Sequence, residues 1–344
     1  MISVDKPYVS ILVPCRNEAG FIVQSVASIL AQVSPAGGFE VIVIDGDSDD
    51  GTSEMLQGIV RSDPRVRIVH NVRRIVSAGL NLGIRQARGS VIVRMDVHTA
   101  YAPDYLCACV KALQDSGADN VGGPWRAIGG GWLPGAIAAA FSSSLVMGGP
   151  RSRDHKYEGD VDTVYLGCWK REAFDRFGYF DEDLVRNQDD EHNLRINSNG
   201  GRVFQSPSIS SSYHSRPSVA QLFRQYAQYG FWKVKVIQKH GCSGALRHYI
   251  PSLCLGIVLF LALLAPFTLF AYYPFVFLLI GYAAINLTLS GVVAASTSYK
   301  FFPLLPVIIA TIHLAYGAGF LQGILTFGIL KQNPGERFQS LTRR

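Results

Sequence analysis

The stretch that decides the fold is Ala87–Leu106, ARGSVIVRMDVHTAYAPDYL. Its run from Ser90 to Met95 is rich in valine and isoleucine, which is typical of a strand buried in a parallel sheet. Asp96 and His98 follow, and because side chains alternate along an extended chain, both are expected to point the same way. Ligands of open α/β sheets bind beyond the carboxyl ends of the strands. The pair is therefore a candidate site for a divalent metal and a phosphate, although these residues alone are more often a plain polar strand exit.

Strands and helices alternate before this stretch. This spacing predicts a parallel, doubly wound α/β sheet with right-handed crossovers. Each strand ends in a loop that carries acidic or basic residues, and parallel strands bring those loops to one edge of the sheet. The predicted strands are Tyr8–Val13, Glu40–Ile44 and Val66–Val69, and the predicted helices are Gly20–Gln32, Met55–Val60 and Ser77–Gln86.

Composition separates a soluble part from an apolar part. Only 17% of the 344 residues are charged, below the usual quarter, and the deficit lies after Tyr249. The net charge of +6 gathers near the apolar runs and in the C-terminal tail, which favours lipid headgroups and phosphate over nucleic acid. Six cysteines without a CxxC pair indicate neither a zinc site nor a disulfide framework. Asp5, Pro7 and Pro14 break the N-terminal segment, so we expect no signal peptide.

Four segments carry a resemblance to a known family. PCRNE (14–18), DGDSDDGT (45–52), AGLNLGIRQARG (78–89) and RMDVH (94–98) resemble, in order and spacing, the nucleotide-binding half of family 2 glycosyltransferases. The resemblance implies a GT-A fold, a Rossmann-like and mostly parallel mixed sheet, here followed by transmembrane helices. The absence of a GxGxxG and of a GxxxxGK[ST] motif counts against a dehydrogenase or an ATPase.

The same resemblance implies a donor site and a metal site. Asp45 would accept a hydrogen bond from the nucleobase, and Pro14 and Glu18 would shape the ribose and base pocket. Asp96 and His98 would hold Mn²⁺ or Mg²⁺, with His214 as a candidate third ligand. The family's usual motif is DxD, and His98 replaces its second aspartate, which manganese accepts. The implied donor-binding set is Pro14, Arg16, Glu18, Asp45, Asp50, Arg74, Asn81 and Asp96.

The segment Phe177–Gly201 is the candidate catalytic segment. A helix is expected from Asp189 to the glycine stop at Gly200, with a cluster of carboxylates at its positive end. By resemblance, Asp189 is the general base, and Gln188 replaces the usual preceding glutamate. A sugar hydroxyl needs such a base because it is a poor nucleophile; a helix cap is the plainer interpretation. The expected acceptor-binding set is Trp125, Asp190, Glu191, Arg216, Gln225 and Trp232.

An amphipathic basic helix is expected over Val219–His240, of the kind that lies on membrane surfaces. RNQDDE, SYHSRPS and RQYAQYGFWKVK resemble membrane-anchored exopolysaccharide glucosyltransferases of the succinoglycan type, which elongate a polyprenyl-diphosphate-linked oligosaccharide. The QxxRW motif of processive synthases is missing after Gln225, so single addition is expected.

Two apolar spans, Pro251–Ala271 and Tyr273–Ser296, are each long enough to cross a hydrocarbon core of about 30 Å. Flanking lysines and arginines predict that both outer ends are cytosolic. The third run, 301–330, either crosses or is re-entrant or interfacial; we favour the second, which keeps the basic tail inside. The expected domains are 1–218 (1–104 nucleotide-sugar half, 105–218 acceptor half), a linker 219–248, a membrane domain 249–330 and a tail 331–344.

The sequence thus predicts an inverting, metal-dependent hexosyltransferase that moves one sugar from a nucleotide-diphosphate donor, a UDP-sugar, to a polyprenyl-diphosphate-linked glycan. Its catalytic domain would lie at the cytosolic face of a bacterial plasma membrane, in contact with membrane lipids and not with nucleic acid. Two alternatives stay open. One is a polyprenyl-phosphate sugar synthase, and the other is a non-catalytic membrane scaffold that has retained the fold.

Overall fold

The structure is a computed structural model that describes residues 8–335 and Phe338. The expectations for Asp5 and Pro7, and for most of the basic tail, lie outside the described residues. Contacts divide the chain into two units, 1–126 with 150–213 and 127–149 with 214–344. Residues 127–149, which we assigned to the glycosyltransferase domain from the sequence, thus group with the C-terminal helices.

The first unit is built on an eight-stranded mixed sheet. Its strand order is β3-β2-β1-β4-β9-β6-β10-β8. The predicted strands form its parallel half, β3 to β4, whereas β9 runs antiparallel to both β4 and β6. A small second sheet has the order β5-β11-β7. The strands are β1 (Val9–Cys15), β2 (Phe39–Asp45), β3 (Val66–His70), β4 (Val91–Arg94), β5 (Thr99–Tyr101), β6 (Asn120–Gly123), β7 (Arg126–Ile128), β8 (Gly159–Asp160), β9 (Tyr165–Lys170), β10 (Val203–Gln205) and β11 (Ser211–His214).

Helices cover both faces of the large sheet, because its strands carry apolar side chains on each face. Ile11 of β1 packs with the helix residues Ile22 and Leu56, whereas its neighbour Leu12 packs in a second core with Leu80. The helices of this unit are α1 (Ile22–Leu30), α2 (Thr52–Ser62), α3 (Val76–Gln86), α4 (Tyr105–Ser116), α6 (Glu172–Phe177) and α7 (Gln188–Ser198). This mixed α/β sheet confirms the predicted fold class.

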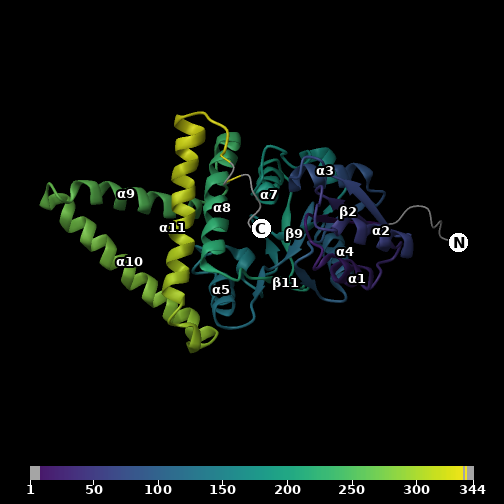
Figure 1. Cartoon of the computed structure of the whole chain (residues 1–344), viewed down its shortest axis with the longest axis horizontal. Helices are drawn as coiled ribbons and strands as arrows, with labels where there is room; N and C mark the ends of the chain where they lie inside the picture. The colour runs from purple at the N-terminus through teal and green to yellow at the C-terminus, as the bar shows by residue number, and fades with distance from the viewer. Residues whose placement is uncertain (1–7, 336–337, 339–344) are drawn as a thin grey trace. The chain divides into compact units, whose positions relative to one another are not determined.

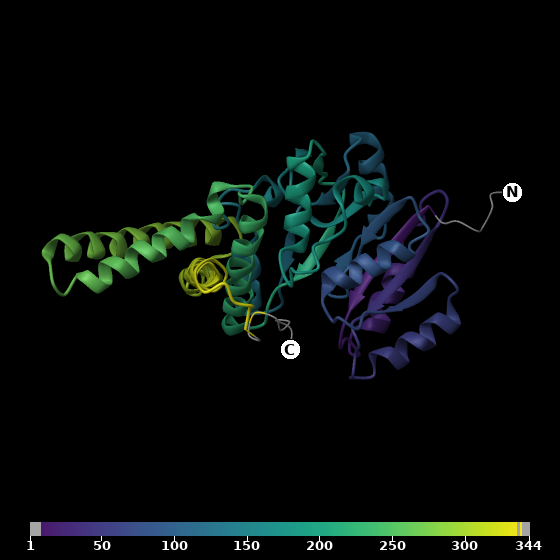
Figure 2. The same cartoon turned by 90° about the horizontal axis from the view of Figure 1, so that it is seen from above.

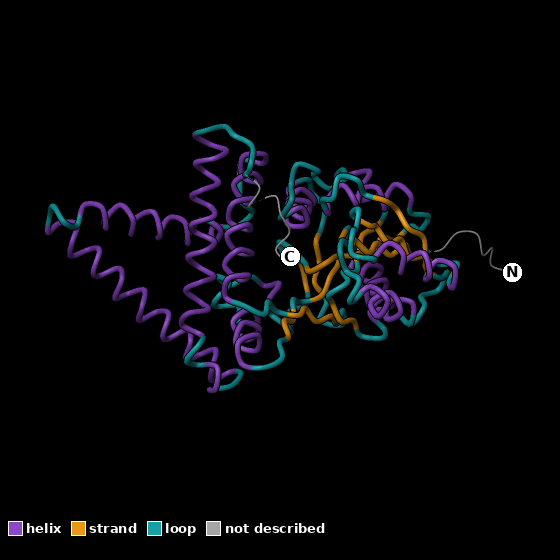
Figure 3. The backbone as a smooth tube through the Cα atoms, in the orientation of Figure 1, coloured by secondary structure: helices purple, strands orange, loops and turns teal. Residues whose placement is uncertain are grey.

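The second unit is helical from α8 onward (Figure 3). Three stretches are long and apolar enough to cross a membrane, namely Leu246–Leu264, Leu269–Ser296 and Leu305–Ile329. Pro266 lies between the first two, and helix α9 ends before it because proline lacks the N–H that would continue the ladder. The predicted first span to Ala271 was therefore too long. The helices are α5 (Trp132–Ser142), α8 (Val219–His240), α9 (Ile250–Leu264), α10 (Leu269–Ser296) and α11 (Leu305–Gly323), which continues as a π-helix to Ile329.

Helix α5 is tied to the C-terminal helices by specific contacts. The Trp132 indole N–H donates to the Lys300 carbonyl at 2.8 Å. A Cβ on Gly135 would lie 2.8 Å from the ring of Phe301, so glycine permits that approach. The imidazole of His313 hydrogen-bonds the Val146 carbonyl at 3.1 Å. The excursion 127–149 is therefore an integral part of the helical unit.

Candidate active site

The two donor loops of the first unit are joined to each other. Strands β1 and β2 are parallel with Cys15 opposite Asp45, so the loops that follow them begin side by side. Backbone amides of the first loop donate to side chains of the second: Asn17 to Ser48 (2.9 Å), Glu18 to Thr52 (2.8 Å) and Ala19 to Asp50 (3.0 Å). PCRNE and DGDSDDGT thus form one surface at the carboxyl edge of the sheet.

The carboxylates of these loops are fixed in place. Asp45 is buried, and its carboxylate accepts hydrogen bonds from Ser48 (2.6 Å) and Ser53. Burial opposes ionisation of Asp50, but hydrogen bonds from Thr52 and from the Ala19 amide outweigh it and lower its pKa.

The remaining donor residues of these loops lie around that surface. Pro14 is the last but one residue of β1, opposite Ile44. Arg16 packs over Gly46, because a Cβ added to Gly46 would lie 3.2 Å from the Cβ of Arg16. Arg74 donates to Asp47 at 2.9 Å.

The Asp96–His98 turn differs from the sequence prediction. Strand β4 ends at Arg94, and Thr99 N–H donates to the Asp96 carbonyl at 3.2 Å, which closes a turn. Side chains alternate only along an extended chain. Asp96 and His98 lie in a turn, so the prediction that alternation makes them point the same way was wrong. Asp96 instead accepts two hydrogen bonds from Arg94 (2.7 and 2.9 Å), whereas His98 Nε2 lies 2.7 Å from Glu18 Oε1.

Arg94 is a site residue that sequence reasoning missed. Its side chain is buried, and its atom Nη1 has no hydrogen-bond partner among the described residues. Asp96 and, more weakly, Asp189 attract the guanidinium and raise its pKa against the cost of burial. A charged residue inside an otherwise apolar strand was the available signal, because such a residue is almost never buried without a partner.

The donor set at this turn suits a divalent metal ion. Carboxylate oxygens and an imidazole are ligands that Mn²⁺ accepts. No group of three or more His, Cys, Asp or Glu side chains among residues 8–335 is placed to hold a metal. That is compatible with an ion held by one or two side chains and completed by substrate phosphates and water. Asp96 and His98 are the residues that would hold it.

The candidate base, Asp189, lies in the first turn of helix α7. Asn187, in the left-handed conformation (φ 62°), turns the chain into the helix at Gln188, which places Asp189 in the first turn. The Asp190 N–H donates to Asp189 Oδ1 at 3.0 Å. Burial raises the pKa of Asp189, and although Arg94 attracts the carboxylate, repulsion from Asp190 raises the pKa further. A half-buried carboxylate with a raised pKa is a better base than an ordinary aspartate.

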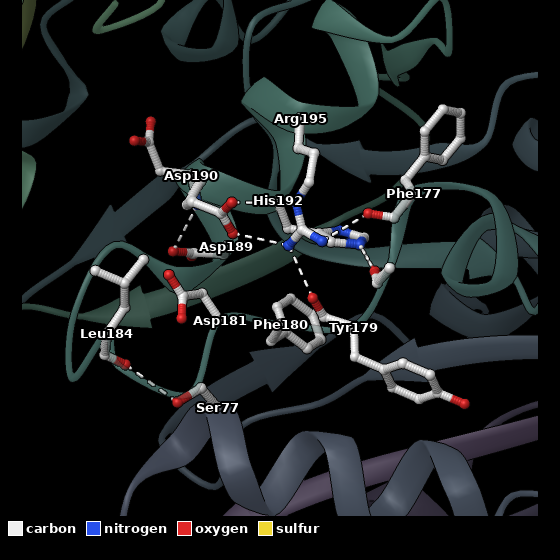
Figure 4. Close-up of polar contacts among 12 residues, drawn as sticks. Ser77, Phe177, Tyr179, Phe180, Asp181, Leu184, Asp189, Asp190, His192 and Arg195 are labelled. Carbon is white, nitrogen blue, oxygen red and sulfur yellow. Dashed lines mark hydrogen bonds and ion pairs between the residues drawn. The ribbon is translucent and has the colours of Figure 1, made fainter. Parts of the chain in front are cut away.

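The loop that leads to α7 is held from two sides (Figure 4). From α7, Arg195 donates to the carbonyls of Phe177 (2.6 Å) and Tyr179 (2.8 Å), and His192 bonds that of Gly178 (3.0 Å). From α3, the Asn81 amide donates to the Phe180 carbonyl (2.9 Å) and to Glu182 (2.8 Å), and accepts from the Phe180 N–H (3.0 Å). Ser77 donates to the Leu184 carbonyl at 3.1 Å. We call residues 177–187 the catalytic loop.

Two predicted ligand-binding residues are engaged in this framework. Glu191 is fully buried and pairs with Arg195 at 2.8 Å, so it does not face an acceptor, and we remove it from the acceptor set. Asn81 is also buried, and its amide groups are engaged with the catalytic loop. Its place in the donor site stays a prediction.

The predicted aromatic platform, Trp125, is covered by other side chains. Its ring stacks on Tyr165, with centroids 5.3 Å apart, and the Arg153 guanidinium lies 3.9 Å from its centroid. Tyr165 in turn hydrogen-bonds Thr99 at 2.9 Å, directly after the Asp96 turn. Trp125 thus supports the floor of the site, and Tyr165 is a further residue that the sequence did not indicate.

The other acceptor and metal candidates lie in the second unit. Arg216 donates to Gln225 at 2.9 Å, and Gln225 donates to the Tyr229 hydroxyl at 2.8 Å, so these polar groups bond one another. Trp232 is buried and donates to the Phe338 carbonyl at 3.0 Å, which makes it a packing residue and not an acceptor platform. His214 is exposed at the end of β11, and its role as a metal ligand stays a prediction.

Comparison with known proteins agrees with this arrangement. The profile of glycosyl transferase family 2 matches residues 10–176. The succinoglycan biosynthesis protein ExoA of Rhizobium meliloti is 31% identical over 92% of this chain and 95% of its own. A dolichyl N-acetyl-α-D-glucosaminyl phosphate 3-β-D-2,3-diacetamido-2,3-dideoxy-β-D-glucuronosyltransferase of Methanococcus voltae is 26% identical over 67% of this chain and 74% of its own.

Solved structures support the fold. The mannosyltransferase PcManGT of Pyrobaculum calidifontis, solved with GDP-Man and Mn²⁺, aligns with a TM-score of 0.59 at 22% identity, over 92% of this chain and 87% of its own. S. aureus TarS 1–349 in complex with UDP aligns with a TM-score of 0.52 at 16% identity, over 91% and 90%. The sheet, the order of the motifs and the near full-length relative lead to one conclusion: this chain belongs to glycosyltransferase family 2, and it is a glycosyltransferase.

Proposed function

We propose that this protein is an inverting, metal-dependent glycosyltransferase that adds one sugar from a nucleotide-diphosphate donor, a UDP-sugar, to a polyprenyl-diphosphate-linked glycan in polysaccharide biosynthesis. It would act at the cytosolic face of a bacterial plasma membrane. The near full-length relative is by name a succinoglycan biosynthesis protein, and the name of the archaeal relative describes transfer to a lipid-linked sugar. The first name supports a role in polysaccharide biosynthesis, and the second supports a lipid-linked acceptor.

One observation carries the catalytic part of the proposal. Arg94 pairs with Asp96 and interacts electrostatically with Asp189, so a single buried cation links the donor half to the first turn of α7. The leaving group and the proton acceptor of a single displacement must lie on either side of one anomeric carbon. The shared partner Arg94 supports the placement of Asp96 and Asp189 at one such reaction centre.

The chemistry follows from these positions. Asp189 removes the proton of the acceptor hydroxyl while its oxygen attacks the anomeric carbon, and the bond from that carbon to the diphosphate oxygen breaks. One displacement inverts the configuration. Asp45 and the joined loops orient the nucleoside, and Asp96 with His98 would hold the divalent ion, which when bound neutralises charge on the departing diphosphate. The stacked rings of Trp125 and Tyr165, both half-buried, would line this region.

The test compares two neighbouring carboxylates. With the full-length protein in detergent, UDP- and GDP-sugars are screened with Mn²⁺, and labelled lipid products are separated by thin-layer chromatography. Asp189→Asn is expected to bind donor normally while transfer falls by about 100-fold to 10,000-fold, the usual worth of a general base. Asp190→Asn, the matched control, is expected to cost far less.

Three results would contradict this proposal. If Asp190→Asn were the inactive variant, the base would be Asp190. A product formed directly on polyprenyl phosphate would favour a sugar synthase. If no nucleotide sugar bound at all, the catalytic proposal would be wrong.

A further inference from the structure

Helices α8 and α11 of the second unit form a tight parallel pair, seen side by side in Figure 1 and Figure 2. A Cβ on Gly319 would lie 1.9 Å from the Ala227 carbonyl, and one on Gly230 would lie 2.1 Å from that of Tyr316. Only glycine allows two helix backbones to approach so closely. Further along both helices, the ring of Phe231 lies 4.8 Å from that of Phe327. The two helices therefore share one depth over this stretch.

The lysines of α8 indicate the depth of this helix pair in the bilayer. Within the paired stretch and just after it, α8 carries Lys235, which is half-buried, and Lys239, which is exposed, whereas Lys233 is buried within the protein. Lys235 lies 5.5 Å from the ring centroid of Phe327, at the end of the paired stretch of α11. Lysines are costly in the hydrocarbon core but favourable at the headgroup level, where they meet anionic lipids. Since α8 belongs at the surface of the bilayer, its close partner belongs there as well.

The exposed side of α11 suits the same position. Val307, Leu314 and Leu325 are about half exposed, and spacings of 7 and 11 residues place them on one face. A single apolar stripe along a helix is what a bilayer surface covers. In Figure 1, α9 and α10 leave the α8–α11 pair at a steep angle, as a hairpin that crosses the bilayer would.

We infer that α11 does not cross the membrane but lies with α8 along the bilayer surface, and that this pair is a docking surface for anionic lipid headgroups. Among residues 8–335, only the α9–α10 hairpin then crosses. The turn after α10 and the described residues that follow α11 then lie on the same side, which agrees with Lys300 and Lys331 near them.

Depth measurement tests the inference on the full chain in phosphatidylcholine and phosphatidylglycerol vesicles. Cys242 and Cys254, which are exposed, are first replaced by serine. Spin labels are then placed at Leu314→Cys and Leu325→Cys, which are about 16 Å apart along the helix axis. Collision with oxygen and with a water-soluble nickel complex should report the same shallow depth for both labels. Depths that differ by more than about 10 Å would mean a crossing helix and would overturn the inference.

A matched pair on α10 provides the control. Phe277→Cys and Leu287→Cys are about 15 Å apart on a helix expected to cross, so their depths should differ. Reporter fusions after Lys300 and after Arg344 give an independent measurement that does not depend on labelling. The inference requires both fusions to report the same side, and opposite sides would overturn it.

Discussion

Asn81→Ala separates two roles for a residue that the family resemblance places in the donor site. In the structure, Asn81 makes three hydrogen bonds to the catalytic loop, and two of them satisfy the buried backbone of Phe180. Leaving that N–H and that carbonyl without partners costs about 1–3 kcal/mol each, or roughly 2–6 kcal/mol together. The loop would then leave its position for part of the time.

The expected effect is on turnover and not on donor affinity. A displacement of about 1 Å at a reacting group costs on the order of 100-fold, so we expect kcat to fall by about 10-fold to 100-fold. The dissociation constant of the nucleotide sugar, measured by calorimetry, should change by less than about twofold. The lost contacts serve only to place the base, and the loss of such contacts lowers kcat and not donor affinity. Ser77→Ala removes one bond to the loop and should give a smaller loss.

The control is Asn199→Ala, which removes an exposed amide that bonds only its own helix, at Arg195. It should leave kcat unchanged, and thermal denaturation should show that all three variants are folded. If Asn81→Ala instead weakened donor binding at unchanged kcat, Asn81 would be a donor ligand and the positioning argument would be refuted.

The remaining predictions concern charge and protonation. Asp96→Ala should abolish Mn²⁺-dependent donor turnover, a loss of several kcal/mol in the transition state, and His98→Ala should mainly weaken metal affinity; a normal Mn²⁺ titration of either variant would contradict the metal assignment for that residue. Because Asp189 must be ionised to act and its pKa is raised, activity should decline on acidification at a higher pH than an ordinary aspartate would give. Burial lowers the pKa of His192 from 6.5 to about 3, so the unfolded chain binds more protons in that window and stability should fall as the pH drops below about 6.5, by up to about 1.4 kcal/mol per pH unit. His192→Phe should lessen that loss between pH 7.5 and 5, measured as the shift in Tm, and an unchanged shift would refute the cause.

The parallel half of the fold could be predicted because its signals are local. Valine-rich runs alternate with helical spacing, so β1 to β4 and the helices between them were located within a few residues. Helix α8 was predicted with its observed bounds because its amphipathic pattern continues for six turns. Strands β5, β7 and β11 were missed, since three or four residues carry no period to detect.

The site was harder to predict where a side chain has several possible hydrogen-bond partners. The place of Asp96 at the sheet edge followed from the strand before it, but its bond to Arg94 depends on a buried guanidinium that periodicity cannot reveal. Glu191 and Trp232 were assigned to an acceptor from their residue type, but Glu191 pairs with Arg195 one turn further along the same helix, and Trp232 donates to the carbonyl of Phe338, 106 residues away. The contacts of Asn81 with Phe180 link segments 99 residues apart, beyond any local pattern.

The excursion that carries α5 has a consequence for how such an enzyme can be recombined. The chain passes between its two units after residues 126, 149 and 213, so the anchor is encoded by two separate stretches. A chimera that took only the stretch after residue 213 from a relative would keep its own α5 opposite a foreign partner for Trp132 and Val146. Such a hybrid should express poorly and aggregate through the mismatched apolar surface. Domain swaps should succeed only when both stretches are exchanged together.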